Sequence, residues 1–150
     1  MGKSIFVIDD YPINLLIAKN IIKHQGFFDI MIPYSEAHLA LEYIVNHKDD
    51  KKSLPDVILL DLNMPVMDGW QFLNEFEELF PTLIRDIDIY ILSSSMNVLE
   101  IKRSKQYQSV NGFLSKPLTL EMIQDVMTTN IANSSLIASN YVCFQKQKLR

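Results

Sequence analysis

The sequence predicts a doubly wound α/β domain, in which helices cover both faces of a five-stranded parallel sheet. Short apolar runs that end in polar residues alternate five times with longer segments whose apolar residues recur every three or four positions. Two of the runs, VILLD and IYIL, are apolar at consecutive positions, as expected of strands buried on both faces. The 150 residues suit a single domain with one main core.

The five short runs are the predicted strands. Parallel neighbours in a sheet need a crossover connection, and a helical segment follows each run, so the order is βα repeated five times. The predicted strands are Ser4–Asp9, Asp29–Pro33, Asp56–Asp61, Ile87–Ser93 and Gly112–Ser115.

The predicted helices have recognisable ends. Pro12 suits the first position of a helix, and Gly26 is a typical residue just beyond the last. Ser35 is a candidate cap for the second helix, because its hydroxyl could accept a hydrogen bond from the first turn. The other helical patterns follow Gly69, Ser95 and Thr119.

Charge and composition exclude several classes of function. The chain has 14 Lys and Arg against 18 Asp and Glu, a net charge of −4, with no basic stripe, so we expect no direct nucleic-acid partner. The single cysteine, Cys143, cannot form an intrachain disulfide, which favours a reducing compartment. The start lacks an export signal, and no apolar stretch is long enough to span a membrane. We therefore expect a cytoplasmic protein.

Polar side chains follow the predicted strands at one edge of the sheet. Ligands of doubly wound sheets bind beyond the carboxyl ends of the strands, where these side chains would meet. The strands end in Asp9 and Asp10, in Asp61, in Ser93 and in Lys116.

This set of side chains is suited to phosphoryl transfer. Three neighbouring carboxylates repel one another, and a divalent cation relieves the repulsion. Oxygen ligands suit Mg²⁺ better than zinc. An ionised Asp can attack phosphorus, while the metal and Lys116 neutralise charge on the transferring oxygens.

Four motifs together resemble the receiver domain of response regulators in two-component signalling, in its chemotaxis-receiver-like, stand-alone form. They are the run FVIDD at 6–10, the run DLNMPVMDG at 61–69, Ser93, and the pair Lys116-Pro117. Their order and spacing agree with the family over about residues 3–130.

The resemblance implies a phosphoacceptor and a metal site. Asp61 would be the phosphoacceptor. Asp9, Asp10 and Asp61 would hold Mg²⁺ together with the backbone carbonyl of Asn63.

The resemblance also implies three residues that respond to the phosphoryl group. Ser93 would be the switch hydroxyl, and Lys116 would pair with the phosphoryl group. Phe113 falls at the aromatic switch position, where its ring lacks the phenolic oxygen of the more frequent Tyr.

The implied function is a phosphorylation-activated switch in a phosphorelay. A sensor histidine kinase or a histidine phosphotransfer protein would donate to Asp61, and the phosphorylated form would bind a downstream protein through about residues 98–130. The domain would not be an enzyme beyond slow self-dephosphorylation. The sequence does not identify the kinase, the target, the signal or the phosphoryl lifetime.

The predicted receiver covers residues 1–130, and 131–150 form a C-terminal extension. Helically spaced apolar residues in the extension are diluted by Asn and Ser, so it is either an extra helix or a frayed tail. It is too short for an output domain, and it could supply a partner or homodimer contact.

Three alternatives stay open. A haloacid-dehalogenase-like phosphohydrolase uses similar residues, but it needs a general acid two positions after the nucleophile, where this chain has Asn63. A scaffold could keep the receiver fold without phosphorylation. A flavin-binding flavodoxin shares the layout, but the acidic edge disfavours a phosphate ligand without a metal.

Overall fold

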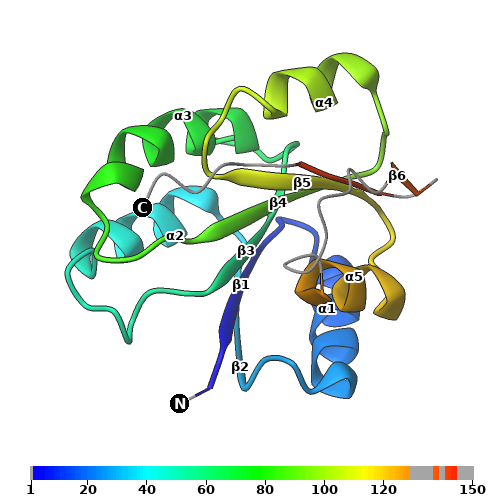
Figure 1. The fold of residues 1–150 in the computed structure, drawn as a ribbon, viewed down its shortest axis with the longest axis horizontal. Coiled ribbons are helices and arrows are strands. Elements are labelled where there is room, and N and C mark those ends of the chain that lie inside the picture. Colours follow the sequence, from blue (N-terminus) through cyan, green and yellow to red (C-terminus); the bar gives the residue numbers. More distant parts are fainter. Residues whose placement is uncertain (1, 129–136, 139–140, 145–150) are drawn as a thin grey trace.

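A computed structural model describes residues 2–128, 137–138 and 141–144 of the chain (Figure 1). Five parallel strands form the sheet in the order β2-β1-β3-β4-β5, which confirms the predicted doubly wound fold. Each predicted strand is present within two residues of its expected bounds. The strands are β1 (Ser4–Ile8), β2 (Ile30–Tyr34), β3 (Val57–Asp61), β4 (Asp88–Ser93) and β5 (Val110–Ser115).

Two short strands extend this sheet beyond β5. They are β6 (Ile137–Ala138) and β7 (Tyr141–Cys143), and β7 pairs antiparallel with both β5 and β6. The sheet therefore has seven strands in the described residues, the five predicted parallel strands and two antiparallel strands that were not predicted.

The C-terminal extension was predicted to be an extra helix or a frayed tail. Neither alternative fits residues 137–138 and 141–143, which are strands of the sheet. Their strand conformation depends on pairing with a distant segment, which helical spacing in the sequence does not reveal. The rest of 131–150 lies outside the described residues.

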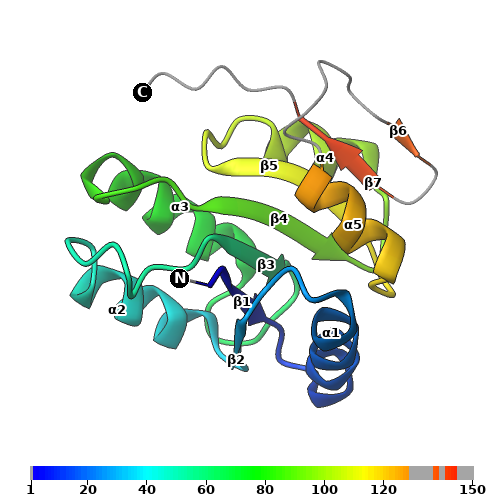
Figure 2. The ribbon, with the colours of Figure 1, turned by 60° about the horizontal axis from the view of Figure 1, so that its bottom comes forward.

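Within the described part of the chain, five helices cover the two faces of the sheet (Figure 2). α1 and α5 pack on one face and α2, α3 and α4 on the other, so each face has its own apolar core. A short 3₁₀ turn, η1 (Phe80–Thr82), follows α3. The helices are α1 (Pro12–Gln25), α2 (Ala37–Asn46), α3 (Gly69–Leu79), α4 (Val98–Ser104) and α5 (Leu120–Thr128).

The ends of α1 agree with the prediction, whereas the start of α2 does not. Pro12 is the first residue of α1, and Gly26 follows its end with a left-handed φ of 71°. Ser35 does not cap α2, because the backbone stays extended through Glu36, which occupies the cap position without a side-chain hydrogen bond. None of the helices in the described part of the chain is long and apolar enough to cross a membrane.

The start of α3 lies against the end of β3. Asp68 caps the helix by accepting a hydrogen bond from the backbone of Gln71, whose side chain accepts one from the Asp68 backbone. A Cβ at Gly69 would lie 2.6 Å from the backbone oxygen of Asp61. Glycine at this position therefore allows the helix to begin directly beside the strand that carries Asp61.

The environment of Tyr141 predicts a measurable pH effect. A hydrogen bond to Asp125, followed by burial, raises the pKa of Tyr141 to about 12, from an ordinary value of 10.0. Because the folded pKa is above the unfolded one, this stabilisation is complete below pH 10 and is lost as the pH rises towards 12. We expect one phenol to titrate near pH 12 in an ultraviolet titration of the folded protein. Tyr141→Phe should remove that step, and an unchanged titration curve would contradict the assignment.

Candidate functional site

The polar residues that follow the strands meet at one edge of the sheet, as predicted. Asp9 follows β1, Asp61 ends β3, Ser93 ends β4, and Lys116 follows β5. The four strands are parallel neighbours in the sheet, and their registers align their carboxyl ends, so these four positions lie side by side. Asp9 and Ser93 are each 1% exposed and Asp61 is 5% exposed. The edge of the sheet thus holds a largely buried polar cluster.

Lys116 links the two buried carboxylates. Its Nζ lies 2.9 Å from Oδ2 of Asp9 and 3.2 Å from Oδ1 of Asp61. Burial lowers the pKa of Lys116, but its hydrogen bonds and ion pairs with Asp9 and Asp61 outweigh this and leave the pKa above its usual value. The ammonium is therefore charged at neutral pH and compensates part of the negative charge.

The carboxyl group of Asp61 is in an unfavourable environment for its own charge. Burial first, and the charge of Asp9 second, raise the pKa of Asp61 above its ordinary value. Lys116 and a 3.3 Å hydrogen bond from the backbone N–H of Asn63 oppose this increase without cancelling it. The ionised form of Asp61 thus needs further positive charge nearby.

Two neighbouring residues orient the carboxylate of Asp9 by hydrogen bonds. The backbone N–H of Tyr11 donates to Oδ1 at 2.9 Å, and the side-chain amide of Asn14 donates to Oδ2 at 3.1 Å. Sequence reasoning missed Asn14, and the only signal was an amide side chain in the first turn of the helix that follows the acidic pair. Asn14 therefore orients a carboxylate of the cluster from the adjacent helix α1.

The carboxylates fit a hard divalent cation. One oxygen each of Asp9, Asp10 and Asp61 lies within 4.8 Å of the others, and the Lys116 ammonium pairs with two of these three carboxylates, Asp9 and Asp61. Asp10 is only half-buried, which leaves the cluster accessible from solvent on that side. An all-oxygen donor set with excess negative charge and solvent access suits Mg²⁺. The predicted contribution of the Asn63 carbonyl stays a prediction.

Mg²⁺ binding should stabilise the folded protein. A ligand at about 100 times its dissociation constant adds about 2.7 kcal/mol, or roughly 5–10 °C in Tm for a chain of this length. We expect Asp10→Asn to reduce this Mg²⁺-dependent shift in a thermal melt, while Asp49→Asn, at an exposed position, keeps it. Equal shifts in both variants would mean that Mg²⁺ binds elsewhere.

Ser93 and Phe113 occupy different environments. The Ser93 hydroxyl accepts a 3.3 Å hydrogen bond from the backbone N–H of Ser95, and the Ser93 carbonyl accepts one of 2.7 Å from the N–H of Lys116. Phe113 is fully buried in the core beneath α2, α3 and α4. The Ser93 backbone is thus tied directly to the end of β5, the strand that carries Phe113.

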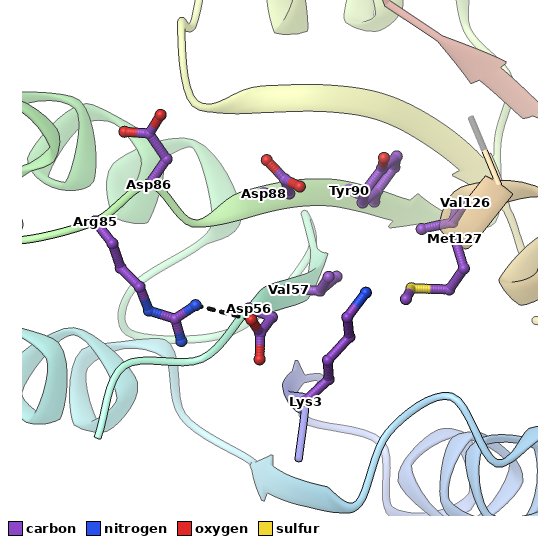
Figure 3. A pocket seen from close by; sticks show the side chains of 9 residues that line it. All are labelled: Lys3, Asp56, Val57, Arg85, Asp86, Asp88, Tyr90, Val126 and Met127. Atoms are coloured by element: carbon purple, nitrogen blue, oxygen red, sulfur yellow. Dashed lines mark hydrogen bonds and ion pairs between the residues drawn. The ribbon is translucent and has the colours of Figure 1, made fainter. Parts of the chain in front are cut away.

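A pocket of about 160 Å³ lies at the other end of the strands, where β1, β3 and β4 begin (Figure 3). Arg85 donates a 2.8 Å hydrogen bond to Asp56, which also accepts one of 2.8 Å from the backbone of Ser4. Asp56 precedes β3, whereas Asp61 ends it, so the length of the strand separates this pocket from the carboxylate cluster. The pocket contains no predicted site residue. Its lining residues are Lys3, Asp56, Val57, Arg85, Asp86, Asp88, Tyr90, Val126 and Met127.

Known proteins resemble this chain over most of its length. The family model of the response regulator receiver domain matches residues 5–128. The probable methanogenesis regulatory protein FilR2 of Methanothrix harundinacea (strain 6Ac) is 26% identical over 117 residues, which are 78% of this chain and 74% of that protein. The chain spans only 22% of the length of a protein-glutamate methylesterase/protein-glutamine glutaminase of Sulfurimonas denitrificans. It spans 8% of the peroxide stress-activated histidine kinase mak1 of Schizosaccharomyces pombe.

Solved structures resemble the fold. A two component response regulator from Cytophaga hutchinsonii has a TM-score of 0.76 at 23% identity, covering 85% of this chain and 96% of that one. The phosphorylated cyanobacterial phytochrome response regulator RcpA has a TM-score of 0.67 at 26% identity, covering 87% and 91%.

Proposed function

Because the chain belongs to the response regulator receiver domain family, we propose that its Asp61 accepts a phosphoryl group and thereby switches the domain between two states. Receiver domains are phosphorylation-controlled switches of two-component signalling. The observation that carries the proposal is the position of Asp61, recessed beside Asp9 and Asp10 with the Lys116 ammonium 3.2 Å from its Oδ1.

The geometry supports direct attack by the carboxylate. An Asp61 oxygen forms the new bond to phosphorus while the N–P bond of a donor phosphohistidine breaks. Lys116 stabilises negative charge on the phosphoryl oxygens from its position between Asp9 and Asp61. Mg²⁺ held by the three carboxylates would supply further charge neutralisation for the same oxygens.

We assign the response to Ser93 and Phe113. The Ser93 hydroxyl lies at the neighbouring strand end, from which it donates a hydrogen bond to a phosphoryl oxygen. This hydrogen bond draws Ser93 toward the phosphoryl group. The backbone hydrogen bond between Ser93 and Lys116 transmits the shift of Ser93 to β5 and its buried Phe113. The phosphoryl group then shifts a two-state equilibrium that a downstream protein reads on about residues 98–130.

The proposed partners are proteins. The donor is a sensor histidine kinase or a histidine phosphotransfer protein, and the reader of the phosphorylated state is a second protein. The net charge of −4 supports protein partners over direct nucleic-acid binding.

The test is phosphoryl uptake. We expect the protein to gain about 80 Da in intact mass after incubation with Mg²⁺ and a small acyl-phosphate donor, and to gain nothing in EDTA. Folded protein that gains no mass from this donor or from a phosphohistidine donor would refute the proposal and favour an unphosphorylated scaffold.

Catalytic turnover is proposed to be limited to slow self-dephosphorylation. Asn63 stands two residues beyond Asp61 and cannot serve as the general acid of a phosphohydrolase. The phosphorylated mass should therefore decay slowly, and a generic phosphate monoester should not be hydrolysed over many turnovers. Rapid multiple turnover would favour the phosphohydrolase.

A further inference from the structure

The outer edge of β5 is covered by the chain's own C-terminal segment. β7 runs antiparallel to β5 with Val142 opposite Phe113, and Figure 2 shows the two strands side by side. The pairing continues to Phe144, whose backbone N–H donates to the carbonyl of Asn111 at 2.8 Å. Residues 141–144 thus fill hydrogen-bonding positions that an edge strand leaves open.

The sequence of β5 is adapted to a closely approaching strand. A Cβ at Gly112 would lie 2.7 Å from the backbone oxygen of Val142 and 2.8 Å from the ring of Tyr90. Both separations are too short for a carbon atom, so a side chain at this position would push the neighbouring strand away. Glycine inside a strand often marks a place where another backbone comes close. Gly112 therefore indicates that this edge is built to receive a strand.

The side chains of the segment reach both helical layers. Tyr141 and Cys143 are buried in the core beneath α1 and α5, and Tyr141 hydrogen bonds with Asp125 of α5. Phe144 packs against the opposite core, with Nζ of Lys105 5.5 Å from the centre of its ring. Lys105 is the residue at the C-terminal end of α4. The segment consequently connects α4, β5 and α5.

We propose that the outer edge of β5 is a docking site for an extended apolar segment, which the chain fills with its own residues 141–144. A partner protein that presents such a segment binds by adding a strand to β5, and only in exchange for β7. The chemistry of the site follows from its present occupant: backbone pairing along three residues, with an aromatic and a small side chain entering the core at alternate positions.

Exchange is physically reasonable because the pairing is short. In the described residues, three residue pairs and the hydrogen bond from Phe144 to Asn111 join the segment to β5. A segment tethered within the same chain competes at an effective concentration on the order of millimolar. An isolated peptide must therefore be present at about that concentration to displace it.

Cys143 allows the exchange to be measured in the full chain. It is the single cysteine of the sequence and is 6% exposed, so its alkylation by N-ethylmaleimide reports departure of β7 from β5. The probe is a peptide of residues 139–146 carrying Cys143→Ser. We expect this peptide, at about millimolar concentration, to raise the alkylation rate at least about threefold. The same peptide with Val142→Pro lacks a backbone N–H in the paired register and should have no effect.

A variant of the full chain gives an independent readout. Phe144→Ala removes one anchor of the segment and should raise Cys143 alkylation and tighten binding of the fluorescently labelled peptide, each about tenfold. Phe27→Ala, at an exposed ring between α1 and β2, is the matched control and should change neither. Far-UV circular dichroism checks the fold of both variants. Equal alkylation rates with the two peptides, or equal peptide binding by wild type and a folded Phe144→Ala, would overturn the proposal.

Discussion

Asp61→Asn is expected to abolish the Mg²⁺-dependent gain of about 80 Da. The amide retains the shape of the carboxyl group but is not a nucleophile toward phosphorus. Asp9 and Asp10 stay in place in this variant, so a loss of uptake would locate the acceptor at Asp61 and not at a neighbouring carboxylate. Intact-mass spectrometry measures the effect, with Asp49→Asn as the control. Uptake by Asp61→Asn at the wild-type rate would show that the acceptor is another residue.

The same variant should be more stable than wild type in Mg²⁺-free buffer. Because burial and Asp9 raise the pKa of Asp61 in the folded state, the contribution of Asp61 to stability is most favourable below pH 3.8 and is lost as the pH rises through the raised pKa. Asn carries no charge, so the variant does not lose the stability that wild type loses when the buried Asp61 ionises. At neutral pH we expect the free energy of unfolding to increase by roughly 0.5–2 kcal/mol in urea titrations. A decrease would mean that Asp61 contributes more through its ion pair with Lys116 than it costs by burial.

Lys116→Met should have the opposite effect on stability. Its removal leaves the carboxylates of Asp9 and Asp61 buried without their shared cation. Removing one partner of a buried ion pair typically costs 3–5 kcal/mol, and protonation of Asp61 would relieve part of this, so we expect a loss of about 3 kcal/mol. Mg²⁺ should restore part of the loss, because it neutralises the same carboxylates.

Chemical denaturation with and without Mg²⁺ measures this effect. Lys102→Met, at an exposed lysine of α4, is the matched control and should change stability by less than about 0.5 kcal/mol. A similarly small change in Lys116→Met would mean that solvent compensates the two carboxylates without help from the lysine. Phosphoryl uptake by Lys116→Met should also be slower than in wild type, because an ammonium that stabilises the transferring oxygens is missing.

The sequence contained enough information to predict most of the parallel sheet. Consecutive apolar residues in VILLD and IYIL are a local signal, since a strand buried on both faces has no polar side. The boundaries of α1 were also local, because Pro12 and Gly26 act through their own backbone preferences. The prediction that Ser35 caps α2 was wrong. The ability of a side chain to cap a helix does not determine where the helix begins, and here the backbone stays extended through Glu36.

The candidate site was predictable because of a property of parallel sheets. Once the strands are parallel, the residues that follow them must lie at one edge, so Asp9, Asp61 and Lys116 could be brought together without coordinates. Contacts made across elements were not accessible in this way. The support of Asp9 by Asn14 and the double ion pair of Lys116 depend on side-chain directions that only packing fixes.

The sequence by itself therefore determined the order of the elements and the residues gathered at the acidic edge, because both follow from local periodicity and strand direction. The tertiary structure alone decided the raised pKa of Asp61, which arises from burial and from the charge of Asp9 on another strand. It also decided the place of residues 141–143, whose strand conformation exists only because they pair with the outer edge of β5 and Gly112 leaves room beside it. Such pairing joins segments far apart in the chain, and no local pattern specifies it.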